Sequence, residues 1–385
     1  MLRKKFLPFL AMALTTSAIA QTDSTQKPAD TTAPKTPPPV TITGSVDAYY
    51  RFNFSDPKPY FNAFGSKIYG NSYTSFTNSQ SSFELGMASI RADHSFGKVS
   101  ATVDLGFGRR AEEFSYNDGS HPTLFAVKQL FASYQASSAV KFTLGKWGTH
   151  IGYEVLDAFA NRNYSMDYMF SFGPFFHTGL KADITLSPTT ALMVGVANPS
   201  DFSTTTSSTK VFIAQFSTGT KDGKLKAFLN YQGYGGVSDT TSFYSGYLYQ
   251  HLSQFDLVVN GTISSKFGVG LNATVQSVKT ATGESGSWWG AAAYLNVDPS
   301  STFGLTLRGE YFSDKHNIKI ADLDGVGDGI NVFDLTLSGL YKVGSNLTII
   351  PELRLDNGSK NFFQKSDGTT TKSTFTALLA VVYHF

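Results

Sequence analysis

The sequence predicts an all-β protein, a transmembrane, antiparallel, up-and-down β-barrel of about 16 strands. Three observations lead to this fold class. Apolar and polar residues alternate along most segments after residue 40, the connections between these segments are alternately long and short, and the chain begins with an export signal and ends in Phe385. Hydrophobic residues make up only 41% of the chain, which excludes a bundle of apolar transmembrane helices.

The alternation has the two-residue period of a β-strand. In the segment 40–54, Ile42, Val46 and Phe52 fall on one face, whereas Asp47 and Arg51 fall on the other. This period places the two sets on opposite sides of a sheet. Proline cannot donate to a strand ladder, so Pro351 predicts a bulge in its strand. The predicted strands are 40–54, 82–94, 99–107, 125–135, 140–146, 176–186, 191–197, 209–217, 224–232, 252–263, 267–277, 287–297, 302–312, 331–341, 347–356 and 374–385.

The connections between these strands fall into two classes that alternate strictly along the chain. The long ones are 55–81, 108–124, 147–175, 198–208, 233–251, 278–286, 313–330 and 357–373, and the third is the longest. The short ones are 95–98, 136–139, 187–190, 218–223, 264–266, 298–301 and 342–346. Outer-membrane barrels combine short periplasmic turns with long outer loops. A soluble β-sandwich or solenoid is the alternative, but neither segregates long loops to one end so strictly.

The chain divides into three parts. Residues 1–20 have a basic start, an apolar stretch and Ala18-Ile19-Ala20, which together predict a secretory signal peptide. A membrane anchor is less favoured because the apolar stretch is shorter than the ~20 residues of a spanning helix. Residues 21–39 are rich in Thr and Pro and predict a disordered periplasmic linker. Residues 40–385 form the predicted barrel.

Composition and motifs exclude several functions. The formal net charge of +2 gives no sign of nucleic-acid binding, and the absence of Cys removes thiolate chemistry. No metalloprotease, P-loop or nucleophile-elbow motif is present, so neither an enzyme nor a cofactor is expected. A metal pair at His150 and His177 is less favoured than packing. Asp322, Asp324 and Asp328 leave Ca²⁺ binding open as an alternative, but their spacing lacks the EF-hand pattern, so a solvated acidic turn is favoured.

The third long connection contains the segment that identifies a known family. Leu144–Val155, with Asn163-Tyr164-Ser165 and Gly173–Leu180, resembles the OmpL-like β-barrel porins, and Gly44–Tyr50 and Arg308–Phe312 are similar too. The resemblance covers essentially the whole predicted barrel. It implies an outer-membrane channel of a Gram-negative bacterium and does not indicate the solute. A closed structural or adhesive barrel and, less favoured, an outer-membrane hydrolase remain alternatives.

The resemblance also implies the partners. They are outer-membrane lipid, small polar solutes and the barrel-assembly machinery, and a homotrimer is one assembly that such a barrel can form. Tyr383 and Phe385 lie on one face of the last strand and resemble the C-terminal signal that the assembly machinery recognises.

Polar positions of the strands should line the lumen, since Lys or Arg facing lipid costs up to ~2–4 kcal/mol at the midplane. Basic and acidic groups are balanced among these positions, which argues against a strongly anion-selective pore. The predicted lining residues are Asp47, Arg51, Asp104, Lys141, Lys181, Asp183, Lys224, Lys226, Asp256, Arg308, Glu310, Asp334, Glu352 and Arg354.

The connection 147–175 is aromatic, and so many apolar rings should not face water. We therefore expect it to fold into the barrel, with a short helix in 155–169, and to narrow the passage for polar solutes. Four of its residues, Glu154, Asp157, Arg162 and Asp167, form the predicted constriction. They are expected to oppose wall residues such as Arg51, Lys181, Arg308 and Arg354. A lid over the mouth is the alternative.

Overall fold

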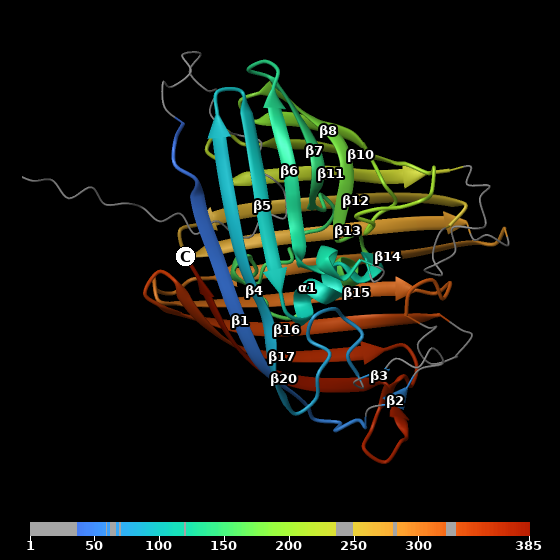
Figure 1. Cartoon of the computed structure of the whole chain (residues 1–385). Helices are drawn as coiled ribbons and strands as arrows, with labels where there is room; N and C mark the ends of the chain where they lie inside the picture. Colours follow the sequence, from blue (N-terminus) through green and yellow to red (C-terminus); the bar gives the residue numbers. More distant parts are fainter. Residues whose placement is uncertain are drawn as a thin grey trace, which may run out of the picture.

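The protein forms one closed antiparallel barrel (Figure 1). The computed structural model describes residues 37–58, 60–61, 67–68, 71–118, 121–235, 249–279, 283–320 and 329–385. Each barrel strand pairs with its neighbours in the chain, and β1 pairs with β20 to close the barrel. Its strands are β1 Thr41–Asn53, β4 Ser82–Phe96, β5 Val99–Phe107, β6 Val127–Gln135, β7 Val140–Gly148, β8 Phe176–Ser187, β9 Thr190–Ala197, β10 Val211–Gly219, β11 Leu225–Tyr234, β12 His251–Ser264, β13 Phe267–Lys279, β14 Ser285–Val297, β15 Phe303–Asp314, β16 Ile330–Val343, β17 Leu347–Gly358 and β20 Ser373–His384.

Every predicted strand corresponds to one of these, so the fold class and the strand number are confirmed. The segments 82–94, 125–135 and 209–217, in which the alternation is weakest, are also strands. Two of them, predicted as 125–135 and 209–217, begin two residues later, at Val127 and Val211, and residues 122–126 form a 3-10 helix before β6. Two short hairpins, β2 Tyr60–Phe61 with β3 Lys67–Ile68 and β18 Phe363–Gln364 with β19 Thr370–Thr371, lie outside the barrel sheet.

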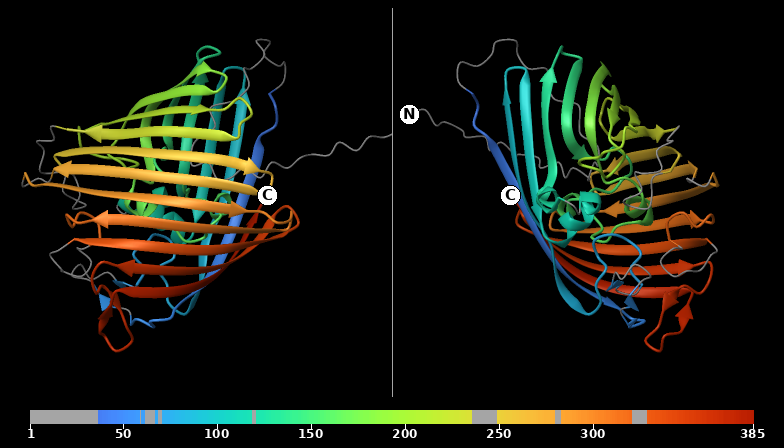
Figure 2. Two further views of the ribbon diagram at one scale, coloured as in Figure 1. Left: turned by 180° about the vertical axis from the view of Figure 1, so that it is seen from behind. Right: turned by 45° about the vertical axis from the view of Figure 1, so that its right-hand side comes forward.

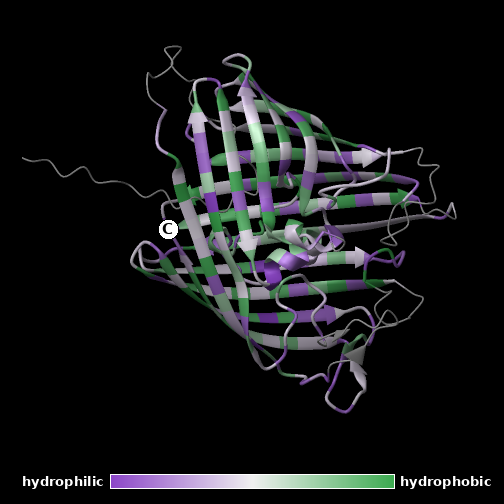
Figure 3. Ribbon diagram, viewed as in Figure 1, coloured by the Kyte–Doolittle hydropathy of each residue, from purple (hydrophilic) through white to green (hydrophobic). Residues whose placement is uncertain are grey.

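The two faces of each strand separate as the alternation predicts. In β1, Asp47 and Arg51 are buried, while Val46 is exposed on the outer face. Figure 3 shows the resulting alternation of hydrophilic and hydrophobic bands along the strands. Outward aromatic pairs such as Trp289–Tyr311 near the outer ends and Phe303–Tyr341 near the periplasmic ends suit the two aromatic girdles of a membrane barrel.

The bulge predicted at Pro351 is wrong. The pairing of β16 with β17 keeps one register on both sides of Pro351, from Tyr341 opposite Ile349 to Ser338 opposite Glu352. Pro351 lies on the exposed outer face and still sits opposite a β20 residue. The missing N–H therefore interrupts the ladder locally without requiring an extra residue.

The predicted lumen position of Lys224 is also wrong. It lies in the turn 220–224, before β11 begins, and its side chain is exposed beside Asp222. Within this turn the Thr220 hydroxyl donates to Asp222 at 2.6 Å, and the Lys224 carbonyl still accepts a hydrogen bond from the N–H of Thr262 at 2.7 Å.

Long and short connections alternate as expected. We number the outer loops in chain order: loop 1 is 54–81, loop 2 is 108–126, loop 3 is 149–175, loop 4 is 198–210, loop 7 is 315–329 and loop 8 is 359–372. Because β7 extends to Gly148, loop 3 is one residue shorter than loop 1, so loop 3 is not the longest. Within the part of the chain that is described, no helix has the length and apolar character needed to cross a membrane.

Loops 1, 2 and 3 enter the barrel and pack there. Helix α1, Arg109–Phe114 in loop 2, lies among the strands in all views (Figures 1 and 2). Buried rings from all three loops form one cluster, in which Phe76, Phe114 and Phe175 are neighbours. The lumen thus holds a largely aromatic hydrophobic core that is formed mainly by side chains of the loops.

The last residue lies at the seam where the barrel closes. The backbone N–H of Phe385 donates to the Gly44 carbonyl, and Gly44 returns the bond, both at 3.0 Å. A Cβ atom at Gly44 would lie 2.7 Å from the Phe385 ring, so the glycine makes room for that ring. The rings of Tyr383 and Phe385 lie 6.2 Å apart, and both side chains are exposed on the outer face.

We predict that deletion of Phe385 impairs barrel assembly. The deletion removes both backbone hydrogen bonds to Gly44 and the terminal ring, whereas deletion of residues 21–33 removes only the Thr- and Pro-rich segment. The amount of folded protein in outer-membrane fractions, measured by heat-modifiable migration, should fall sharply for the first variant. Phe385→Tyr should assemble normally, and equal levels of both deletion variants would contradict the prediction.

Candidate pore site in the barrel lumen

Loop 3 crosses the lumen and is held by carboxylates of the opposite wall. Glu310 on β15 accepts hydrogen bonds from the backbone N–H groups of Tyr168 and Met169, at 2.7 and 2.9 Å. Glu352 on β17 accepts one from the N–H of Tyr164 at 2.8 Å. All these atoms are buried, so the wall supplies the acceptors that an irregular segment inside a barrel lacks.

Arginines of the same wall satisfy the loop's carbonyl groups. Arg308 donates to the Ser165 carbonyl and Arg354 to the Met166 carbonyl, both at 2.7 Å. Arg308 and Arg354 also share Asp334, at 3.3 and 2.7 Å. The arginines are therefore fixed on one side by the loop and on the other by a wall carboxylate.

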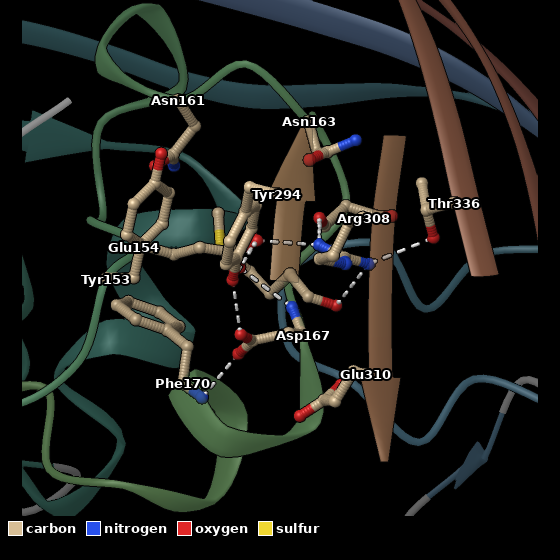
Figure 4. Close-up of polar contacts among 12 residues, drawn as sticks. Tyr153, Glu154, Asn161, Asn163, Asp167, Phe170, Tyr294, Arg308, Glu310 and Thr336 are labelled. Carbon is tan, nitrogen blue, oxygen red and sulfur yellow. Dashed lines mark hydrogen bonds and ion pairs between the residues drawn. The ribbon is translucent and has the colours of Figure 1, made fainter. Parts of the chain in front are cut away.

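Two of the predicted constriction residues meet at Arg308 (Figure 4). Glu154 pairs with Arg308 at 2.7 Å and accepts a hydrogen bond from the N–H of Asp167 at 2.8 Å. Asp167 accepts a bond from the Tyr294 hydroxyl at 2.7 Å and caps helix α2, Tyr168–Phe172, through Phe170. Burial raises the pKa of Glu154, the Asp167 charge raises it further, and Arg308 opposes both.

The other two predicted residues anchor the loop elsewhere. Asp157 pairs with Lys128 of β6 at 2.6 Å, and Lys128 also contacts Asp104 at 3.1 Å. Arg162 binds Asp298 in the periplasmic turn 298–302 through two parallel contacts of 3.0 and 3.1 Å. Loop 3 therefore begins at the outer end of β7 and reaches the periplasmic end of the barrel.

The predicted wall residues divide between different loops. The Tyr164 hydroxyl donates to Asp47, so Asp47 contacts loop 3. Arg51 instead donates to the carbonyls of Ser79 and Asn71 in loop 1. Arg51 thus faces loop 1, although we expected it to face loop 3.

Lys181 and Asp183 lie on β8, away from the contacts of loop 3 with β15 to β17. Their charged groups are 3.6 Å apart, and Lys181 lies over the Trp147 ring at 5.4 Å. Lys181 therefore does not meet the acidic residues of loop 3 that we expected it to oppose.

The helix expected within 155–169 is only partly present. A 3-10 turn covers Ala158–Ala160, and α2 begins at Tyr168 and continues beyond the expected range. Asp167 determines where α2 begins, because its side chain satisfies an N–H of the first turn.

Other sites considered from the sequence have different outcomes. His150 and His177 lie with their ring centroids 5.1 Å apart, but the described residues contain no group of three or more His, Asp or Glu placed to hold a metal. Asp322, Asp324 and Asp328 lie outside the described residues.

The sequence interpretation missed the contribution of loop 2. Arg110 is fully buried, with its guanidinium 4.9 Å from the rings of both Phe76 and Tyr164, and it donates to the Leu156 carbonyl at 3.0 Å. It connects loops 1, 2 and 3. Loop 1 is dense in aromatic residues, the same property that singled out loop 3. This density, together with the Arg109–Phe114 run in loop 2, was the available signal.

A closed sixteen-strand barrel with short turns at one end, and with an outer loop inside its lumen, has the architecture of an outer-membrane porin. The chain belongs to the family described as "Putative beta-barrel porin-2, OmpL-like", whose model matches residues 39–385. The protein is thus a porin of the Gram-negative outer membrane. A search of the curated proteins finds no match.

Solved structures with the same fold are distant in sequence. The anion-selective porin from Comamonas acidovorans is 12% identical with a TM-score of 0.58, covering 90% of this chain and 99% of that one. The outer membrane channel DcaP of Acinetobacter baumannii is 12% identical with a TM-score of 0.55, covering 90% and 97%. OmpT of Vibrio cholerae is 12% identical with a TM-score of 0.54, again covering 90% and 97%. At this identity the likeness shows the fold alone.

We predict that acidification loosens the start of loop 3. Burial lowers the pKa of His150 to about 4, and Lys181 lowers it further, while the Tyr231 carbonyl opposes both. A released His150 titrates near 6.5, so the seated loop binds fewer protons and loses stability as the pH falls from about 6.5 toward 4. Amide exchange in 149–154, corrected for intrinsic rates, should rise over this window.

His150→Gln should remove most of that pH dependence, because glutamine does not titrate. His121→Gln is the matched control, since His121 is exposed in loop 2. If exchange in 149–154 follows the same pH profile in the wild type and in His150→Gln, His150 does not control this segment.

Proposed function

We propose that the protein is a channel for passive diffusion of small polar solutes, that loop 3 forms its narrowest part, and that it has no enzymatic activity. The observation that carries this proposal is the anchoring of loop 3 from β6 to the periplasmic turn 298–302, through Asp157 and Arg162. A barrel of 16 or more strands otherwise leaves an aqueous channel. A loop fixed across that space limits what can pass.

The anchors are strong enough to hold such a loop. Charge-assisted hydrogen bonds are about twice as strong as neutral ones, and a two-contact arginine–carboxylate pair also fixes orientation. The backbone contacts of Glu310 and Glu352 add acceptors that the loop would otherwise lack, and an unsatisfied buried N–H costs about 1–3 kcal/mol. Loop 3 should therefore keep one position rather than sample the lumen.

We predict that the double variant Asp157→Ala, Arg162→Ala raises single-channel conductance by roughly twofold, because a freed loop 3 tip leaves more of the lumen open. Planar-bilayer recording measures this, and deletion of residues within loop 3 should have a larger effect. The matched control is Lys365→Ala with Asp367→Ala, which removes the same charges from the exposed part of loop 8. Unchanged conductance and ion preference in both loop 3 variants would mean that another segment lines the narrowest point.

One observation favours a second candidate, a closed structural barrel. The cavity beside Arg51 and Arg354, between loops 1 and 3, has a volume of about 10 Å³, which is room for about one water molecule. Around it, rings such as Tyr73 and Phe362 stack at 4.0 Å. Steady conductance by the folded wild type would support the channel, and silence with intact folding would support the closed barrel.

We further propose that the barrel assembles as a homotrimer. A trimer form is described for OmpT of Vibrio cholerae, a structure with a TM-score of 0.51. The outer face carries exposed apolar side chains, among them Phe83 and Leu85 at 87% and 80% exposure, that lipid or a second barrel can cover. The mass of the protein in mild detergent should be three times that of the 41.8 kDa chain, less any segment removed on export. A single-chain mass would refute this proposal.

A further inference from the structure

The structure distributes the balanced charges of the lumen unevenly between buried and accessible positions. The carboxylates that face loop 3 are occupied by its backbone. Glu310, Glu352 and Asp256 each accept at least one N–H of loop 3, at 2.7, 2.8 and 3.0 Å. All three are at most 3% exposed. These acidic groups are enclosed and contribute little to the potential that a passing ion meets.

Several other charged groups of the lumen lie in pairs or triads that cancel. Arg91 pairs with Asp93 at 2.7 Å, and Arg162 and Lys342 both approach Asp298. Lys128 lies between Asp104 and Asp157. The four basic and four acidic groups sum to zero. They are Arg91, Lys128, Arg162 and Lys342 against Asp93, Asp104, Asp157 and Asp298.

Three lysines of the wall, on β7, β8 and β11, exceed their acidic partners. Asp183 lies between Lys141 and Lys181, with contacts of 3.7 and 3.6 Å, so one carboxylate serves two ammonium groups beyond normal hydrogen-bond length. Lys226 on β11 makes no hydrogen bond or ion pair within the described residues, and it shares the inner face of its strand with buried Phe228. The three lysines and Asp183 leave a net charge of +2.

We propose that Lys141, Lys181 and Lys226 give the periplasmic half of the lumen a preference for anions, so that the channel passes small anions such as chloride ahead of cations. This inference rests on the proposed channel function and deepens it. It also departs from the balanced composition, from which no strong anion preference was expected. The difference arises because loop 3 encloses acidic groups but leaves Lys141 and Lys226 partly exposed in the lumen. Lys181 is itself enclosed and offsets the charge of Asp183, so the charge of Lys141 is not cancelled.

The chemistry of the lysines supports this role. An ammonium group is a compact point charge with three rotatable donors, and these groups have few protein acceptors. Lys141 is 24% exposed and Lys226 is half-buried, whereas Lys181 is only 6% exposed and acts by offsetting Asp183. In a confined lumen with low-dielectric walls, such uncompensated charges concentrate ions of the opposite sign.

The reversal potential of the wild-type barrel in a KCl gradient tests the inference. We expect the wild type to prefer chloride over potassium. Lys141→Gln, Lys181→Gln and Lys226→Gln should each lower the permeability ratio by roughly twofold, and the triple variant should lower it most. Asp183→Asn should raise the ratio, because it removes the carboxylate that offsets two of the lysines.

Two controls separate charge from folding. Lys224→Gln removes one exposed charge from the turn beside β11, outside the lumen, and should leave the ratio unchanged. Lys181→Arg keeps the charge and should retain the wild-type ratio. Heat-modifiable migration identifies variants that fail to fold. If the triple variant fails to fold, the permeability ratios of Asp183→Asn and of the single variants provide the test.

The outcomes distinguish the anion preference from the channel function. A wild-type channel that prefers potassium, or a triple variant with the wild-type ratio, overturns the anion preference while the channel function stands. A folded wild type that conducts no ions overturns the proposed function, and the anion preference with it.

Discussion

The position of loop 3 depends on buried wall carboxylates that accept its backbone N–H groups. A segment without regular structure inside a barrel has no ladder to satisfy its polar groups, and each unsatisfied buried group is costly. Glu310 and Glu352 supply the acceptors, and Arg308 and Arg354 supply donors to the carbonyls of the same segment. These hydrogen bonds allow a loop without regular secondary structure to adopt one path from the outer end of β7 to the periplasmic turns.

The same contacts change what the charged wall can do. A charge that holds a loop is neutralised and enclosed, so it does not act on solutes in the way that a free charge does. Arg308, for example, is fully buried between Glu154, Asp334 and the loop. In the proposed anion preference, the groups that act on a passing ion are those that no loop contacts, such as Lys141 and Lys226.

The lumen of the barrel also contains a packed hydrophobic core. Loops 1, 2 and 3 bring aromatic rings into the lumen, where Phe76, Phe114 and Phe175 pack together and Arg110 joins the three loops. This interior core couples the loops, because a change in loop 1 or loop 2 alters the surface on which loop 3 rests. The packing of loop 3 in the lumen therefore depends on all three loops.

The sequence by itself determined the strands, their faces, their number and the closure of the barrel, because a two-residue period and the connection lengths are local properties of the chain. It also placed loop 3 inside the barrel, since so many aromatic rings should not face water, and Arg308 on the inner wall, since lipid excludes its charge. Only the tertiary structure decided that Arg51 serves loop 1, that Arg162 reaches Asp298, and that Pro351 needs no bulge. Those outcomes depend on which loops enter the lumen and on contacts between residues far apart in the chain, and no periodicity encodes them.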